Sequence, residues 1–206
     1  MFGAIPYMGI GSRSGVIFKQ EQSCQSPAHR VQYASIMVFS YYNRLNSAQK
    51  RVYRKSDDIH AVPLPSASGL HPFIFELVEA LEHEDRAKTE YFCQKLTADL
   101  VAGLTAPPVR VNVLAARPSA SWGELHGLYV PAQGRTSAVI TVWMRTAQRR
   151  QVVAFRSFLR TLLHEICHHL DYELFNLSDS FHTEGFYKRE SSLFHQLMNR
   201  EKGRGE

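Results

Sequence analysis

The sequence predicts an α+β fold, in which a small mixed sheet packs on one long helix and further helices lie N-terminal to the sheet. Three short segments within residues 109–143 alternate apolar and polar side chains, which is typical of strands. Residues 152–175 contain no Gly or Pro and repeat apolar residues at helical spacing. Strands therefore precede a long, partly buried helix.

The composition is that of a globular protein. The 206 residues are 44% hydrophobic and 21% charged, which excludes the disordered and fibrous classes. This length fits one domain, with or without an appended segment, and suffices to bury a core. The net charge of +5 is spread over short clusters, so it permits an acidic partner without requiring one.

Cysteine usage and hydropathy predict the compartment. Three cysteines without a CxxC spacing indicate neither a disulfide framework nor a zinc ribbon, so we expect a reducing compartment and a cytoplasmic protein. Residues 1–18 are interrupted by glycines and lack a charged start, unlike a signal peptide. No apolar run is long enough to cross a bilayer, and we expect no membrane association.

Three regions follow from the distribution of turn-forming residues. Residues 61–72 are rich in Pro, Ser and Gly and predict a linker. Residues 1–60 are then an N-terminal extension that is partly helical, and residues 73–206 form the main domain.

Within the N-terminal extension, residues 1–27 show no sustained period and predict a mobile or loosely packed terminus. The apolar spacing over residues 31–54 predicts two helical pieces. Asn46 or Ser47 is the expected cap where the second piece begins, because both side chains can accept from the first free backbone amides.

The main domain begins with two predicted helices. Pro72 stands at a first helical position, and a second helix is expected over residues 86–100, ending near Gly103. The prolines at 107 and 108 end this pattern. The three predicted strands follow at residues 109–114, 126–130 and 138–143.

The long helix carries a metal-binding pattern. His164 and His168 are four residues apart, so their rings lie about one turn apart on the same face and can bind one metal ion. Glu165 follows the first histidine on the adjacent face, where its carboxylate can accept a proton from metal-bound water. The full pattern is H-E-x-x-H, and imidazole ligands favour Zn²⁺.

A catalytic zinc ion usually takes a third protein ligand. Residues 176–180 form a turn-rich break, and a second helical pattern follows from Phe186. A helix after a tight connection tends to pack back against its predecessor, which would bring His182 to the two helix histidines. Glu184 is the alternative third ligand, because a carboxylate also binds zinc.

Several residues near the three histidines have two possible roles. Asp171 could accept a ring N–H from a ligand or be a solvated acid at a helix end. Tyr187 and Arg189 could stabilise a developing oxyanion, or could serve in aromatic packing and a surface ion pair. Cys167 is expected to pack rather than bind metal, and His169 is expected to be a hydrogen-bonded surface histidine.

Residues 127–193 resemble the SprT-like family of zincin metallopeptidases. The family pattern is a strand, a second strand, a helix bearing TLLHExxH and then HGxxF. The corresponding segments here are GLYV, AVITVW, TLLHEICH at 161–168 and HTEGF at 182–186, with Thr183 where the family has Gly. The resemblance implies that residues 73–206 are a zincin-like metallopeptidase domain with three histidine ligands, a glutamate base and a peptide or protein substrate.

The expected mechanism is hydrolysis of a peptide bond. Zinc polarises the carbonyl and lowers the pKa of its water, and Glu165 takes the proton and returns it to the leaving amine. We expect residues 138–143 to be an edge strand that binds an extended substrate through main-chain hydrogen bonds.

Two rival hypotheses remain at this point. The zinc could be structural, in a basic binding module whose residues 188–204 contact nucleic acid or a protein partner, although no motif supports nucleic acid. Alternatively, the first 70 residues could recruit or occlude the substrate of a regulated protease.

Overall fold

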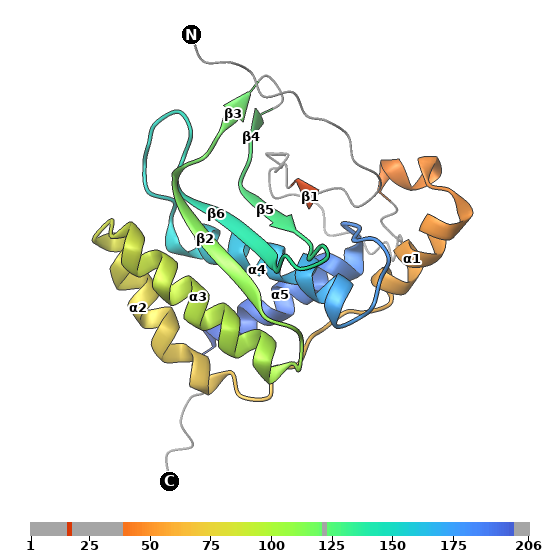
Figure 1. Ribbon diagram of the computed structural model, residues 1–206, viewed down its shortest axis with the longest axis horizontal. Helices are drawn as coiled ribbons and strands as arrows, with labels where there is room; N and C mark the ends of the chain where they lie inside the picture. The colour runs from red at the N-terminus through yellow and green to blue at the C-terminus, as the bar shows by residue number, and fades with distance from the viewer. Residues whose placement is uncertain (1–15, 18–38, 121–122, 200–206) are drawn as a thin grey trace, which may run out of the picture.

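The computed structural model describes residues 16–17, 39–120 and 123–199. Its main sheet has the strand order β1-β5-β6-β2. Figure 1 shows α2 and α3 side by side along β2, with α4 and α5 behind β5 and β6. The predicted α+β class, with a small mixed sheet packed on the long helix, is confirmed in these terms. The sheet consists of β1 (Val16–Ile17), β5 (Gly127–Val130), β6 (Ala138–Arg145) and β2 (Val109–Ala116).

The sheet is mixed and is buried on one face. β2 runs parallel to β6, whereas β5 runs antiparallel to β6, and this register aligns Val111, Ile140 and Tyr129 across the three strands. All three side chains are buried, while alternate positions are more exposed. The three predicted strands are therefore present, with the period-two burial that places one face against helices.

The expectation that residues 138–143 form an edge strand is wrong. β6 is hydrogen-bonded to β5 on one side and to β2 on the other, so its main chain is not free to pair with a substrate. Alternation of side chains reports which face is buried but not how many neighbours a strand has. A short hairpin of β3 (Ser119–Ala120) and β4 (Gly123–Glu124) lies before β5 and was not predicted.

The two predicted scaffold helices are present as α2 (His71–Glu82) and α3 (Arg86–Gly103). The side chain of Asp85 caps α3 by accepting from Lys88 N. α2 and α3 pack against each other, and α3 packs on β2. Leu77, Leu96 and Leu100 from this pair are buried in the same core as the sheet.

The N-terminal part of the described chain contacts the main domain. α1 (Ser47–Asp57) begins at the predicted cap, where Asn46 and Gln49 bond each other's backbone N–H, and it packs against α5. The first predicted helical piece is a 3-10 helix, η1 (Ser40–Arg44), in its described portion, and residues 31–38 lie outside the described residues.

Within the predicted linker, Val62 and Leu70 are buried in the core, and a short 3-10 helix, η2 (Ser68–Leu70), leads directly into α2. The predicted loosely packed terminus, residues 1–27, lies outside the described residues apart from Val16–Ile17, whose backbone pairs with β5.

The last two helices position the candidate site. α4 (Phe155–Glu173) corresponds to the predicted long helix, and it packs on β5 and β6 and against α5 (Glu184–Met198). Thr183 caps α5 by accepting from Phe186 N. Across the described ranges, we find no helix with the length and apolar character needed to span a membrane.

Candidate metal centre

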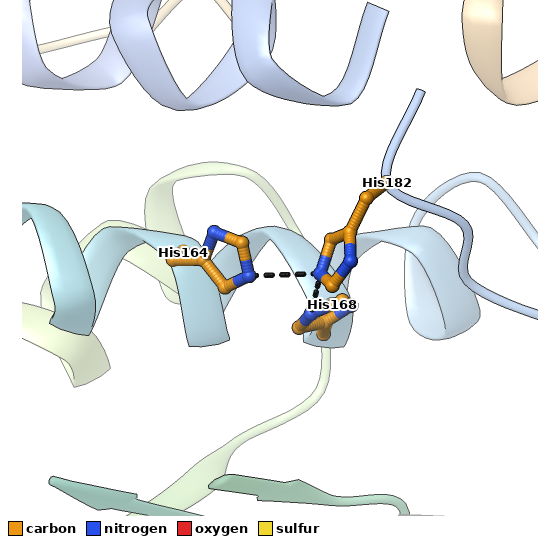
Figure 2. Close-up of side chains that lie close together, drawn as sticks. All are labelled: His164, His168 and His182. Carbon is orange, nitrogen blue, oxygen red and sulfur yellow. Dashed lines mark hydrogen bonds between the residues drawn. The ribbon is translucent and has the colours of Figure 1, made fainter. Parts of the chain in front are cut away.

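Three histidines from two segments converge beside α4. His164 and His168 lie one turn apart on α4, and His182 comes from the extended residues just before the cap of α5 (Figure 2). Nε2 of His182 lies 2.9 Å from Nε2 of His164 and 3.1 Å from Nε2 of His168. One ring nitrogen from each histidine lies within 4.8 Å of the other two, so the three histidines could hold a metal ion.

The connection between α4 and α5 brings His182 to this position. Leu177 N donates to the carbonyl of Asp171, and Asn176 adopts a positive φ of 51°, which reverses the chain after α4. The Tyr41 hydroxyl donates to the carbonyl oxygen of His182 at 2.9 Å and so ties the segment to η1. The predicted pairing of His182 with the two helix histidines is thus present in the structure.

Burial keeps the three imidazoles neutral. The pKa of His168 is lowered well below its ordinary value, and that of His164 is lowered too, chiefly because both rings are desolvated. Burial and the neighbouring His164 lower the pKa of His182 to about 3. Neutral imidazoles have the free electron pairs that metal binding requires.

Glu165, which follows His164 on α4, is buried and has no hydrogen-bonding partner among the described residues. Its side chain is 0% exposed, and neither carboxylate oxygen bonds to any residue in the described part of the chain. Desolvation, with a smaller contribution from Glu190, raises the pKa of Glu165 well above its ordinary value. An unpaired buried carboxyl destabilises a fold, which makes Glu165 a candidate functional residue.

Gly127, at the start of β5, makes room for this carboxyl group. A Cβ atom at Gly127 would lie 2.8 Å from Cγ and Cδ of Glu165 and would overlap its Oε1. The backbone of β5 therefore forms the wall against which Glu165 rests.

Two ligand candidates have their other ring nitrogen bonded within the protein. Nδ1 of His164 lies 3.1 Å from Oε2 of Glu190, whose other oxygen accepts from Arg160 at 3.2 Å. Nδ1 of His168 lies 2.7 Å from Oγ of Ser180. Both rings are thereby oriented with Nε2 toward His182.

Asp171 reaches His168 through Ser180. The Ser180 hydroxyl donates to Oδ2 of Asp171 at 2.7 Å, and Oδ1 of Asp171 accepts from Arg189 at 2.7 Å. Asp171 is 0% exposed, which corrects its reading as a solvated helix-end acid. Burial raises the pKa of Asp171 to about 6, although Arg189 and Ser180 act in the opposite direction.

Arg189 is also fully buried, so the interpretation of Arg189 as part of a surface ion pair is wrong. Its guanidinium donates to Asp171 and to the carbonyls of Ser56 and Ile59 at 2.6 and 2.7 Å. These bonds direct it to the end of α1, and within the described part of the chain none of its hydrogen bonds goes to the histidine cluster. Arg189 therefore does not fit the alternative role of oxyanion donor.

Tyr187 lies at the outer side of the cluster. Its ring stacks on His182, with centroids 5.9 Å apart and planes at 26°, and it is 37% exposed. Phe39 packs against it from the N-terminal segment at 5.9 Å between centroids. Burial raises the pKa of Tyr187, so its hydroxyl keeps its proton at neutral pH and remains a donor.

The remaining predicted residues lie outside the cluster. Glu184 pairs with Lys188 at 2.7 Å on a partly exposed face of α5 and does not join the three histidines. Cys167 is buried in the apolar core, as expected. His169 is buried rather than on the surface, and its two nitrogens bond to the Tyr129 hydroxyl and the Pro107 carbonyl.

Sequence reasoning missed Glu190, Ser180 and Gly127 as parts of the site. Glu190 follows Phe186 by four residues and precedes Leu193 by three, so helical spacing places it on the apolar face of α5. This position could have identified Glu190 as an acid that faces the core. Gly127 opens a strand pattern, where a glycine often marks a close approach of another group. Ser180 lies in a turn-rich segment and carried no such signal.

Comparisons with protein-family models, with curated proteins and with solved structures found no match to this chain.

Proposed function

We propose that this protein is a zinc-dependent metallopeptidase similar to the SprT-like zincins, with His164, His168 and His182 as ligands. The observation that carries the proposal is the convergence of three imidazole nitrogens next to Glu165, a buried carboxyl with no hydrogen-bonding partner in the described ranges. A closed structural zinc site has four protein ligands, often cysteines, and has no use for such a carboxyl.

The donor set fits zinc. Two nitrogens that each lie about 2.0–2.1 Å from one zinc ion are at most about 4 Å apart. The distances of 2.9 and 3.1 Å from His182 to the other two rings are within that limit. Neutral imidazoles also suit zinc better than they suit magnesium or calcium, which prefer oxygen ligands.

Zinc at these ligands would supply a Lewis acid that polarises a carbonyl group and acidifies water. Glu165 acts as the base that takes a proton from the attacking water and then delivers it to the leaving amine. Its buried position strengthens this transfer, because a desolvated carboxylate holds a proton more firmly than an exposed one. Gly127 keeps the carboxyl group in place.

Tyr187 is the residue best placed to assist at the carbonyl oxygen. It stays protonated at neutral pH, it is partly exposed and it lies against His182. A phenol donor stabilises the negative charge that develops on an attacked carbonyl. A peptide or protein is the substrate class that this chemistry and the family resemblance favour.

The test is hydrolysis of an unfolded, fluorescently labelled protein by zinc-loaded wild type and by Glu165→Gln. We expect turnover by the wild type, and a loss of at least about 100-fold with zinc content unchanged in the variant, because only the base is removed. Equal turnover in the variant would rule out this mechanism. Zinc binding without any hydrolysis by the wild type would instead favour the non-catalytic binding module.

A further inference from the structure

We propose that Ser180, Asp171 and Arg189 form a positioning chain that sets the His168 imidazole for metal binding and connects it to the end of α1. This inference rests on the proposed metal site. The four side chains are linked in series by contacts of 2.7 Å each, and Ser180, at 7%, is the most exposed of them.

The direction of the hydrogen bonds determines where the His168 ring carries its proton. The Ser180 hydroxyl has one hydrogen, and it is donated to the Asp171 carboxylate. The oxygen of Ser180 can therefore only accept from Nδ1 of His168, which must carry the ring proton. Nε2 then has the free electron pair, and it is Nε2 that lies near His182.

Arg189 makes this arrangement stable in a buried place. An isolated carboxylate at 0% exposure would be too costly, and the guanidinium supplies both an opposite charge and a direct hydrogen bond. Arg189 is in turn fixed by three acceptors at the end of α1, which are Ser56 O, Ser56 Oγ and Ile59 O. The last turn of α1 is thus the far end of the chain that begins at His168.

The hydrogen bonds that orient the His164 ring involve other residues. Glu190 accepts from that ring, and its second partner is Arg160, whose side chain is 41% exposed. Both Glu190 and Arg160 come from the α4 and α5 pair and not from α1. Of the two helix ligands, His168 is therefore the one whose orientation depends on the N-terminal segment.

A consequence is that metal binding and α1 docking should stabilise each other. If docked α1 favours the metal-binding orientation of His168, then bound metal favours docked α1 by the same free energy. The N-terminal segment, which the sequence presents as an extension, would then be part of the metal centre's support.

The first test is zinc affinity of the full chain, measured by competition with a chromophoric chelator. We expect Ser180→Ala to bind zinc about 10–100-fold more weakly than wild type. Ser180→Thr, which keeps the hydroxyl, should stay close to wild type. Thr89→Val, which removes a buried hydroxyl bonded to its own helix, should leave the affinity unchanged. A Ser180→Ala affinity within twofold of wild type would overturn the positioning role.

The melting temperature of each metal-free variant separates positioning from stability. A merely structural Ser180 would lower that temperature without changing the zinc affinity of the folded chain. Failure of the wild type itself to bind zinc would overturn the proposed metal site, which is a different outcome.

The second test needs no metal. Histidine ¹⁵N spectra of the metal-free wild type should show His168 with its proton on Nδ1, and Ser180→Ala should show a mixture of the two ring forms. His168 with its proton on Nε2 in the wild type would contradict the proposed positioning chain of Ser180, Asp171 and Arg189.

A third measurement addresses α1. Zinc should slow hydrogen exchange of peptides from residues 47–59 in the wild type and should slow it less in Ser180→Ala. Equal slowing in both proteins would overturn the connection to α1.

Discussion

The backbone of Gly127 in strand β5 lies so close to the side chain of Glu165 in helix α4 that any side chain at position 127 would displace the carboxyl group. A Cβ atom there would lie 2.8 Å from Cγ and Cδ of the glutamate. The position of the proposed catalytic base thus depends on a glycine 38 residues earlier in the sequence. This dependence leads to the first prediction.

Gly127→Ala should lower the catalytic rate by about 100-fold, since a displacement of about 1 Å in a catalytic group has effects of this size. Zinc content should stay unchanged, because the atoms nearest to the added methyl all belong to Glu165, which is not one of the three proposed ligands. Peptidase assays with parallel metal analysis would check the prediction. Gly103→Ala is the matched control, since its nearest neighbouring atom would be 4.0 Å from the added methyl. Wild-type turnover in Gly127→Ala would contradict the role of this contact.

Glu190→Ala should weaken zinc binding by about 10-fold or more, because the ring proton of His164 would lose its acceptor. Arg160→Gln should have a smaller effect, since Arg160 is 41% exposed and bonds to Oε1 of Glu190, whereas Oε2 is the oxygen that faces His164. Chelator competition measures both. A larger effect for Arg160→Gln than for Glu190→Ala would show that the ion pair, and not the histidine contact, matters.

Gly185→Ala should destabilise the fold by about 1–3 kcal/mol, the usual effect of overpacking. An added methyl would overlap the backbone carbonyl of Asp57, and this backbone cannot move without shifting the end of α1. The Gly185 amide also donates to the Asp57 side chain at 2.9 Å. Urea unfolding of the metal-free chain would measure the loss. An unchanged unfolding midpoint would mean that α1 and α5 approach less closely than the structure has them.

The stability of the metal-free chain should depend on pH through Glu165. Because its folded pKa is raised, the folded state holds a proton that the unfolded state releases above the ordinary value of 4.5. Stability from this group is therefore present at low pH and is lost as pH rises toward the folded pKa. Relative to wild type, Glu165→Gln should become more stable with increasing pH, by up to about 1.4 kcal/mol per pH unit. Unfolding at pH 5 and pH 8 tests the sign, and a constant difference between the two proteins would contradict the raised pKa.

Local patterns predicted the helices and the centre of the site. With 3.6 residues per turn, the spacing of His164 and His168 places both on one helix face, and the apolar residues form a stripe. Both features could be predicted from the sequence. The cap at Asn46 could also be predicted, because capping depends only on residues close in the sequence.

Contacts between segments that are far apart in the sequence could not be predicted. β6, which was expected to be an edge strand, pairs on both sides. The side-chain pattern within one strand says nothing about its partners. For Arg189 the sequence left two interpretations open, an oxyanion donor and a surface ion pair, and neither places it in the core. Its burial depends on Asp171, on Ser56 and on Ile59, which come from two other parts of the chain.

Metal content tests the central claim most directly. Wild type, His182→Ala and Glu184→Ala would be loaded with zinc, dialysed equally against a weak chelator and measured by elemental analysis. We predict about one zinc ion per chain in the wild type and in Glu184→Ala, and loss of that ion in His182→Ala. No zinc in the reloaded wild type, or zinc lost only in Glu184→Ala, would contradict a centre built from three histidines.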